Sequence, residues 1–111
     1  MDKKEFLQHI LDLLASSKNV TSRAMFGGYG LYKNKVITAL IAYNTLYFKV
    51  GKLNLSDFEK AGSSPFTYLA KNGKKAVMSY WEVPKHILQN PKELVKWFEN
   101  AYRASLSTKR K

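Results

Sequence analysis

The sequence predicts an α+β fold in two layers, in which helices cover one side of a five-stranded antiparallel sheet. Apolar residues repeat at helical spacing near both ends of the chain, and the segments between them have the alternating or continuous apolar pattern of strands. An Asn-Gly pair, which is typical of tight hairpins, joins the last two of these segments. The expected order is therefore helix, three strands, helix, two strands, helix.

The first helix is expected over residues 2–15. Asp2 and Glu5 have the spacing of a capping box, in which each side chain accepts a hydrogen bond from the other residue's backbone. The apolar residues share one helical face, which must be buried: Phe6, Leu7, Ile10, Leu11 and Leu14. A chain of 111 residues suits one core, so we expect one domain over residues 1–106 and a flexible basic tail over residues 107–111.

Three extended segments follow. The first begins at Arg23 and holds three glycines, which inside a strand mark a bulge or the close approach of a neighbour. The second, residues 36–42, is almost wholly apolar and is expected to be a central strand covered on both faces. In the third, residues 46–50, apolar residues alternate with Tyr47 and Lys49, so these two side chains are expected to point away from the core.

The second half of the chain predicts a short helix, a hairpin and a final helix. Ser56 and Glu59 have capping-box spacing. Residues 66–70 and 76–82 flank the Asn-Gly pair, whose tolerance of positive φ favours a hairpin turn. The last helix is expected to begin at Pro91, because proline is favoured in a first helical turn.

Positive charge is concentrated in the predicted sheet. The 19 Lys and Arg residues outnumber the 8 Asp and Glu residues, which gives a formal net charge of +11 and a pI near 9.9. No acidic residue lies between Asp12 and Asp57 or between Glu59 and Glu82, and both stretches carry several lysines. A field of this sign attracts polyanions.

The residue types argue against an enzyme, a metal centre or a cofactor site. The chain has no cysteine and only two histidines, His9 and His86, whereas a zinc site needs three or four convergent ligands. Ser63 and Ser64 lack the glycine-flanked elbow of a hydrolase nucleophile. The glycine block, residues 27–30, is not followed by a helix whose N-terminus could hold a phosphate. Polar residues interrupt the early apolar stretch, so we expect a cytoplasmic protein without membrane contact.

Two features are candidates for binding a nucleic acid or another partner. The first is a pair of basic hairpin tips, residues 33–35 and 71–75, with Arg23 and the basic tail as auxiliaries. The alternative is that these lysines only protect strand edges and keep the protein soluble. The second is the Tyr47 ring, which could stack on a base, although aromatic residues on sheets mainly pack across strands. The candidate residues are Arg23, Lys33, Lys35, Tyr47, Lys49, Lys71, Lys74 and Lys75.

Several sequence blocks in order resemble one family. They are residues 23–32 (RAMFGGYGLY), 39–42 (ALIA), 46–50 (LYFKV), 65–68 (PFTY), 78–84 (MSYWEVP) and the proline-capped last helix. Together they resemble the N-terminal domain of the TfoX/Sxy competence regulators over roughly residues 2–105. The resemblance implies a fold similar to the secretion-chaperone-like class. It also implies a structural role for Met25, Phe26, Gly27, Gly28 and Gly30.

The sequence departs from the family pattern in two places. It ends where members with a C-terminal domain continue, which indicates a stand-alone domain, and Gly51 stands where an acidic residue is expected. We therefore expect a non-catalytic binding module in bacterial transcriptional or competence regulation, acting through an unidentified protein partner. Two alternatives remain: direct, largely sequence-tolerant nucleic-acid binding by a basic sheet edge, and a self-associating module that forms a homodimer.

Overall fold

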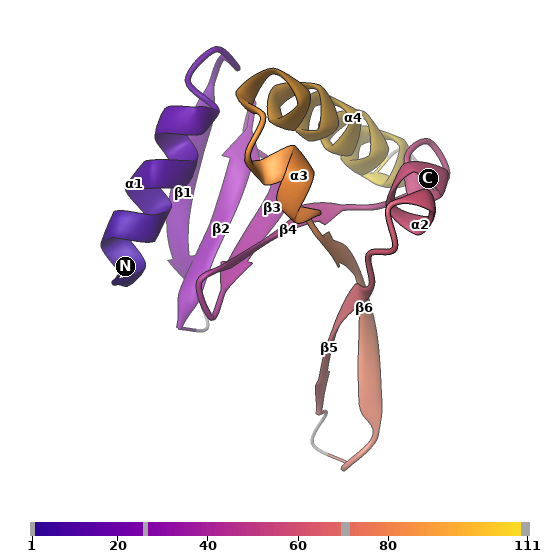
Figure 1. Cartoon of the computed structure of the whole chain (residues 1–111). Coiled ribbons are helices and arrows are strands. Elements are labelled where there is room, and N and C mark those ends of the chain that lie inside the picture. The colour runs from indigo at the N-terminus through magenta and orange to yellow at the C-terminus, as the bar shows by residue number, and fades with distance from the viewer. Residues whose placement is uncertain (1, 26, 70–71, 110–111) are drawn as a thin grey trace.

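A computed structural model describes residues 2–25, 27–69 and 72–109, without the side chains of residues 68, 69, 75, 76, 108 and 109. Within these residues the chain forms one antiparallel sheet, in the strand order β1-β2-β3-β4-β6-β5, together with four helices (Figure 1). The helices are α1 (Lys3–Leu13), α2 (Leu55–Lys60), α3 (Lys85–Leu88) and α4 (Pro91–Lys109). The strands are β1 (Val20–Met25), β2 (Gly28–Lys33), β3 (Val36–Ala42), β4 (Thr45–Lys49), β5 (Pro65–Leu69) and β6 (Lys75–Glu82).

The α+β class and the antiparallel sheet are confirmed, with six strands in place of five. The first expected strand is two strands, because the chain reverses at Gly27, whose φ of 76° is in the left-handed region that glycine adopts without strain. Met25 and Gly28 are therefore paired across a tight turn. Two further differences are that α3 was not predicted and that α4 continues to Lys109, past the expected start of the tail.

The helix α1 begins as its sequence predicts. The backbone N–H of Glu5 donates to the Asp2 carboxylate at 2.9 Å, and the backbone N–H of Asp2 donates to the Glu5 carboxylate at 3.1 Å. The capping box expected at Ser56 does not form, because α2 begins at Leu55 and Ser56 therefore lies inside its first turn. Its preceding residue, the buried Asn54, instead accepts from the backbone N–H of Gly51 at 2.8 Å and donates to the carbonyl oxygen of Lys49 at 2.9 Å.

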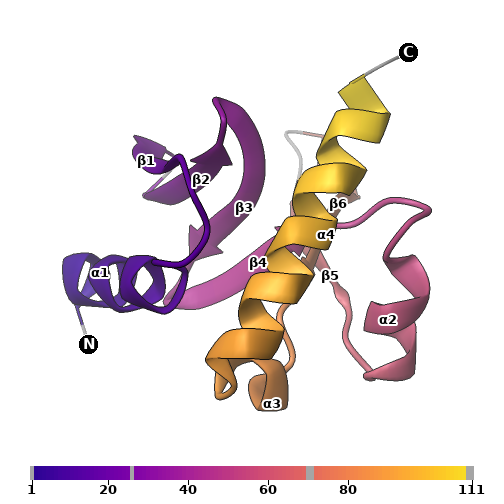
Figure 2. The ribbon, with the colours of Figure 1, turned by 90° about the horizontal axis from the view of Figure 1, so that it is seen from above.

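One hydrophobic core joins all four helices to a single face of the sheet. In Figure 1, α1 and α3 lie in front of the strands, and the view from above in Figure 2 shows α4 crossing over β4. Phe48 of β4 packs on Phe98 of α4 with ring centroids 5.5 Å apart. The sheet contributes Leu31, Ala39, Ile41, Leu46 and Phe48, and the helices contribute Phe6, Ile10, Phe58, Ile87, Leu94, Phe98 and Ala101.

The opposite face of the sheet carries the side chains that alternate with the core residues along each strand. The strand β3 is central, as expected, but helices cover only one of its faces, and Leu40 on the other face is half-buried. The strand register places Arg23, Gly30, Leu40, Tyr47 and Glu82 in one row across this face, and it places Lys49 beside Tyr80. We call it the uncovered face, and its side chains include Arg23, Tyr32, Leu40, Tyr47, Lys49, Phe66, Tyr80 and Glu82.

The glycines of β2 allow the close approaches that the sequence predicts. A Cβ atom at Gly28 would collide with the backbone carbonyl of Ile41 on β3. A Cβ atom at Gly30 would lie 2.6 Å from the Met25 terminal methyl and 3.2 Å from the Tyr32 ring. The register also shifts next to these glycines, between Leu31 and Tyr32, which is where a bulge bends the sheet.

Substituting Gly28 with alanine should destabilise the fold, because backbone atoms of two paired strands must move apart. We expect Gly28→Ala to lower the free energy of unfolding by about 1–3 kcal/mol. The matched control is Gly51→Ala, whose new Cβ would meet Ala104 at an ordinary 3.4 Å. Urea denaturation of the two variants measures the difference, and equal midpoints would show that the β2–β3 spacing can relax.

Candidate functional site

The predicted basic residues do not gather into one patch. Arg23 is exposed on the uncovered face, Lys35 is exposed in the β2–β3 turn, and Lys74 is exposed beside the β5–β6 turn. The β2–β3 turn lies near the helices, whereas the β5–β6 hairpin projects away from them (Figure 1). Lys71 and the side chain of Lys75 lie outside the described residues. The two basic turns therefore present separate surfaces.

The prediction that Lys33 belongs to an exposed basic tip is wrong, because this residue is buried. Its Nζ donates to the carbonyl oxygen of Lys18 at 2.7 Å and to Ser17 Oγ at 3.1 Å. It also lies 3.3 Å from a carboxylate oxygen of Glu99 on α4, and Ser17 Oγ donates to that same oxygen at 2.6 Å. The Lys33 ammonium thus joins the end of β2 to α4 and cannot meet a polyanion.

Tyr47 and Lys49 lie on the uncovered face, as the alternation in β4 predicts. The half-buried Tyr47 ring packs across strands against Phe66, with centroids 4.9 Å apart and an edge-on geometry. Burial raises the pKa of the Tyr47 phenol, and the nearby Glu82 carboxylate raises it further. Cross-strand packing and partial exposure are therefore combined in one ring.

The ammonium of Lys49 is held by neutral groups. It donates to Ser79 Oγ at 2.7 Å and lies 5.2 Å from the centroid of the Tyr80 ring. Burial lowers the pKa of Lys49, because partial removal of water disfavours its charged form. Neither ion pair found among the described residues includes it.

Ser79, Tyr80 and Phe66 were not predicted to surround Tyr47 and Lys49. The alternation in β4 shows which side chains point outward, but it does not show which strand lies beside β4. The structure pairs β4 with β6 through Lys49 opposite Tyr80 and Tyr47 opposite Glu82. Burial raises the pKa of Tyr80, and the nearby Tyr32 raises it further, which makes Tyr32 a fourth aromatic residue of this region.

Two glycines of the block, Gly28 and Gly30, lie where neighbouring atoms come close to the backbone. Met25 and Tyr32 lie in the space above Gly30 that a side chain would fill, and Gly28 lies against β3. Phe26 lies outside the described residues.

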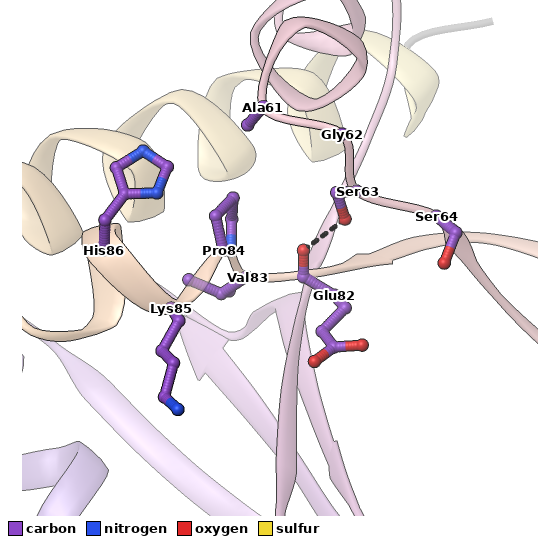
Figure 3. A pocket seen from close by; sticks show the side chains of 9 residues that line it. All are labelled: Ala61, Gly62, Ser63, Ser64, Glu82, Val83, Pro84, Lys85 and His86. Atoms are coloured by element: carbon purple, nitrogen blue, oxygen red, sulfur yellow. Dashed lines mark hydrogen bonds between the residues drawn. The ribbon is translucent and has the colours of Figure 1, made fainter.

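A hollow of about 240 Å³ lies between the α2–β5 connection and the start of α3 (Figure 3). It contains a serine, a histidine and an acid, but they do not converge. The Ser63 hydroxyl donates to the backbone carbonyl of Glu82 at 2.5 Å, and the Pro84 ring separates it from His86. The Glu82 carboxylate points away from both (Figure 3). Across the described part of the chain, no group of three histidine or acidic side chains could hold a metal ion.

The fold and these side chains define a small, basic α+β domain with one helix-covered sheet face and one aromatic, cationic face. Residues 12–105 match the family of the TfoX N-terminal domain, and the chain belongs to this family. No curated protein matches the sequence. Membership supports a regulatory, competence-related binding module, without identifying a partner. None of the helices in the described ranges has the length and apolar character that a membrane crossing needs.

Replacing Lys33 with methionine should destabilise the protein, because the partly exposed Glu99 carboxylate loses its cation and the carbonyl oxygen of Lys18 loses its donor. We expect Lys33→Met to lower the free energy of unfolding by roughly 1–3 kcal/mol. Lys35→Met, two residues away and exposed, is the matched control and should change it by less than about 0.5 kcal/mol. Chemical denaturation distinguishes the two, and a Lys33→Met variant as stable as the control would mean that the Lys33–Glu99 ion pair adds no net stability.

Proposed function

We propose that this chain is a non-catalytic, cytoplasmic binding module that serves bacterial transcriptional or competence regulation through contacts with another protein. Its family supports the regulatory class of binding module. The contact with another protein is inferred from one part of the β5–β6 hairpin, residues 67–69 and 75–78. These residues pair only with each other, because β4 does not extend alongside them. We call this part the free ribbon.

The free ribbon begins where β4 ends. Lys49 pairs with Tyr80, and the last backbone hydrogen bond across this boundary joins the N–H of Val50 to the carbonyl oxygen of Ser79 at 2.8 Å. The chain then turns into α2, so the pair formed by Thr67 and Val77 has only the other strand of the hairpin as a neighbour. Figure 1 shows the hairpin extending beyond the body of the protein.

The free ribbon exposes both an apolar side chain and a strand edge. The Val77 side chain is 67% exposed, and β5 is an edge strand of the sheet. Two-stranded ribbons are only marginally stable in water. A partner that adds a strand to β5 would pair its backbone groups and cover Val77, which supports docking by strand addition. Lys74 beside the turn favours a partner with acidic side chains and discourages unselective pairing.

A charge placed on the free ribbon should prevent binding of the partner protein. We expect Val77→Lys to abolish capture of the protein that the wild type retains when tagged protein is cross-linked in its native host and analysed by mass spectrometry. The matched control is Leu53→Lys, which puts the same charge on an apolar side chain that is 63% exposed beside α2. The control should retain the partner.

A second measurement, of the mass in solution, distinguishes another protein from a second copy of this chain as the partner. Light scattering of the purified wild type should give the monomer mass if the partner is a different protein, and a concentration-dependent dimer mass if two copies pair through β5. Retention of the same captured protein by Val77→Lys would place the docking surface elsewhere.

A further inference from the structure

The centre of the uncovered face combines a cation and three aromatic rings. Tyr47 and Lys49 are two residues apart on β4, so both project from the same side of the sheet. Tyr80 lies beside Lys49, and Phe66 lies beside Tyr47. We call these four residues, together with Ser79, the Lys49 cluster.

The Lys49 ammonium has the surroundings of an anion site. Its contacts are a hydroxyl at 2.7 Å and a ring face at 5.2 Å, both neutral. An anion that replaced the remaining water would form a charge-assisted hydrogen bond, which is stronger than a neutral one. A nearby negative charge would also oppose the lowering of the Lys49 pKa, because it favours the ammonium form.

The neighbouring rings provide a surface for a flat, apolar group. Tyr47 and Phe66 meet at an interplanar angle of 65°, so they are not stacked on each other. Both rings are half-buried, which leaves part of each one accessible. Aromatic residues on an open sheet face are a recurrent platform for unpaired bases.

Charge on this face favours a polyanion. Arg23 lies in the same cross-strand row as Tyr47 and is exposed, and the one carboxylate in the described part of that row is Glu82. The whole chain carries a net charge of +11. A repeating ligand with a phosphate and a ring in each unit matches an ammonium beside aromatic rings. An acidic peptide supplies the charge without the rings.

We propose that the uncovered face binds single-stranded nucleic acid, with a backbone phosphate at Lys49 and a base against Tyr47 and Phe66. This site is separate from the free ribbon and does not depend on the protein partner proposed above. A duplex keeps its bases stacked and cannot place one against rings that lie within a sheet, so the single strand is the favoured form.

Fluorescence anisotropy of a labelled twelve-nucleotide oligothymidylate tests the proposal. We expect Lys49→Gln to weaken binding roughly tenfold and to reduce the slope of log affinity against log salt by about 0.7, the value for one phosphate contact on a single strand. The matched control, Lys35→Gln, removes the same charge from the β2–β3 turn and should change the affinity less than about twofold. Equal effects of the two variants would overturn the site.

Two substitutions at Tyr47 separate the ring from the charge. Tyr47→Phe retains a ring and should bind within about twofold of the wild type, whereas Tyr47→Leu retains an apolar side chain without a ring and should bind roughly five- to a hundredfold more weakly. Circular dichroism and thermal unfolding establish that both variants are folded. Equal affinity of the two would show that no base stacks at this position.

Two competitors and the Val77→Lys variant of the free ribbon test whether binding is specific to the single strand and to the uncovered face. Duplex DNA of the same length and poly-glutamate should compete weakly. If either competes as well as the single strand, the face is a general anion or acidic-protein surface and the proposal fails. Val77→Lys should bind the oligonucleotide at least as well as the wild type, which keeps failure of this site distinguishable from failure of the protein contact.

Discussion

Packing of all four described helices against one face of a single sheet is the constraint on which the rest of the structure depends. Ile10, Phe48 and Phe98 are completely buried in the shared core. A chain of this length supplies one such core, and its helices are used in covering one sheet face. The other face must therefore be built from side chains that tolerate partial contact with water. Tyrosine and lysine do so, because each has an apolar body and a polar end.

The parts of the fold that depend on local pattern could be predicted from the sequence. The capping box of Asp2 and Glu5 forms because both bonding partners lie within one helical turn. Tyr47 and Lys49 project away from the core because side-chain direction alternates along any strand. Gly73 has a φ of 79°, in agreement with a hairpin turn at the Asn-Gly pair.

The parts that depend on distant contacts could not be predicted in this way. Lys33 is a charged residue in a polar turn sequence, and its burial is explained by contacts with Ser17, Lys18 and Glu99, which lie far from it in the sequence. The glycines of β2 suggested a bulged single strand, but the backbone also reverses at Gly27, which separates β1 from β2. The surroundings of Lys49 depend on which strand lies next to β4, and that is set by the whole sheet.

The amide of Asn54 gives the two faces of the sheet a mechanical connection. It donates to the carbonyl oxygen of Lys49 and accepts from the N–H of Gly51, and the next residue begins α2. Phe58 of α2 in turn packs between Trp81 and Trp97 in the core. A small displacement of the backbone at Lys49 therefore strains one buried amide and, through it, the first turn of a helix on the far side. One buried side chain therefore fixes the backbone at the end of β4 and the start of α2 relative to each other.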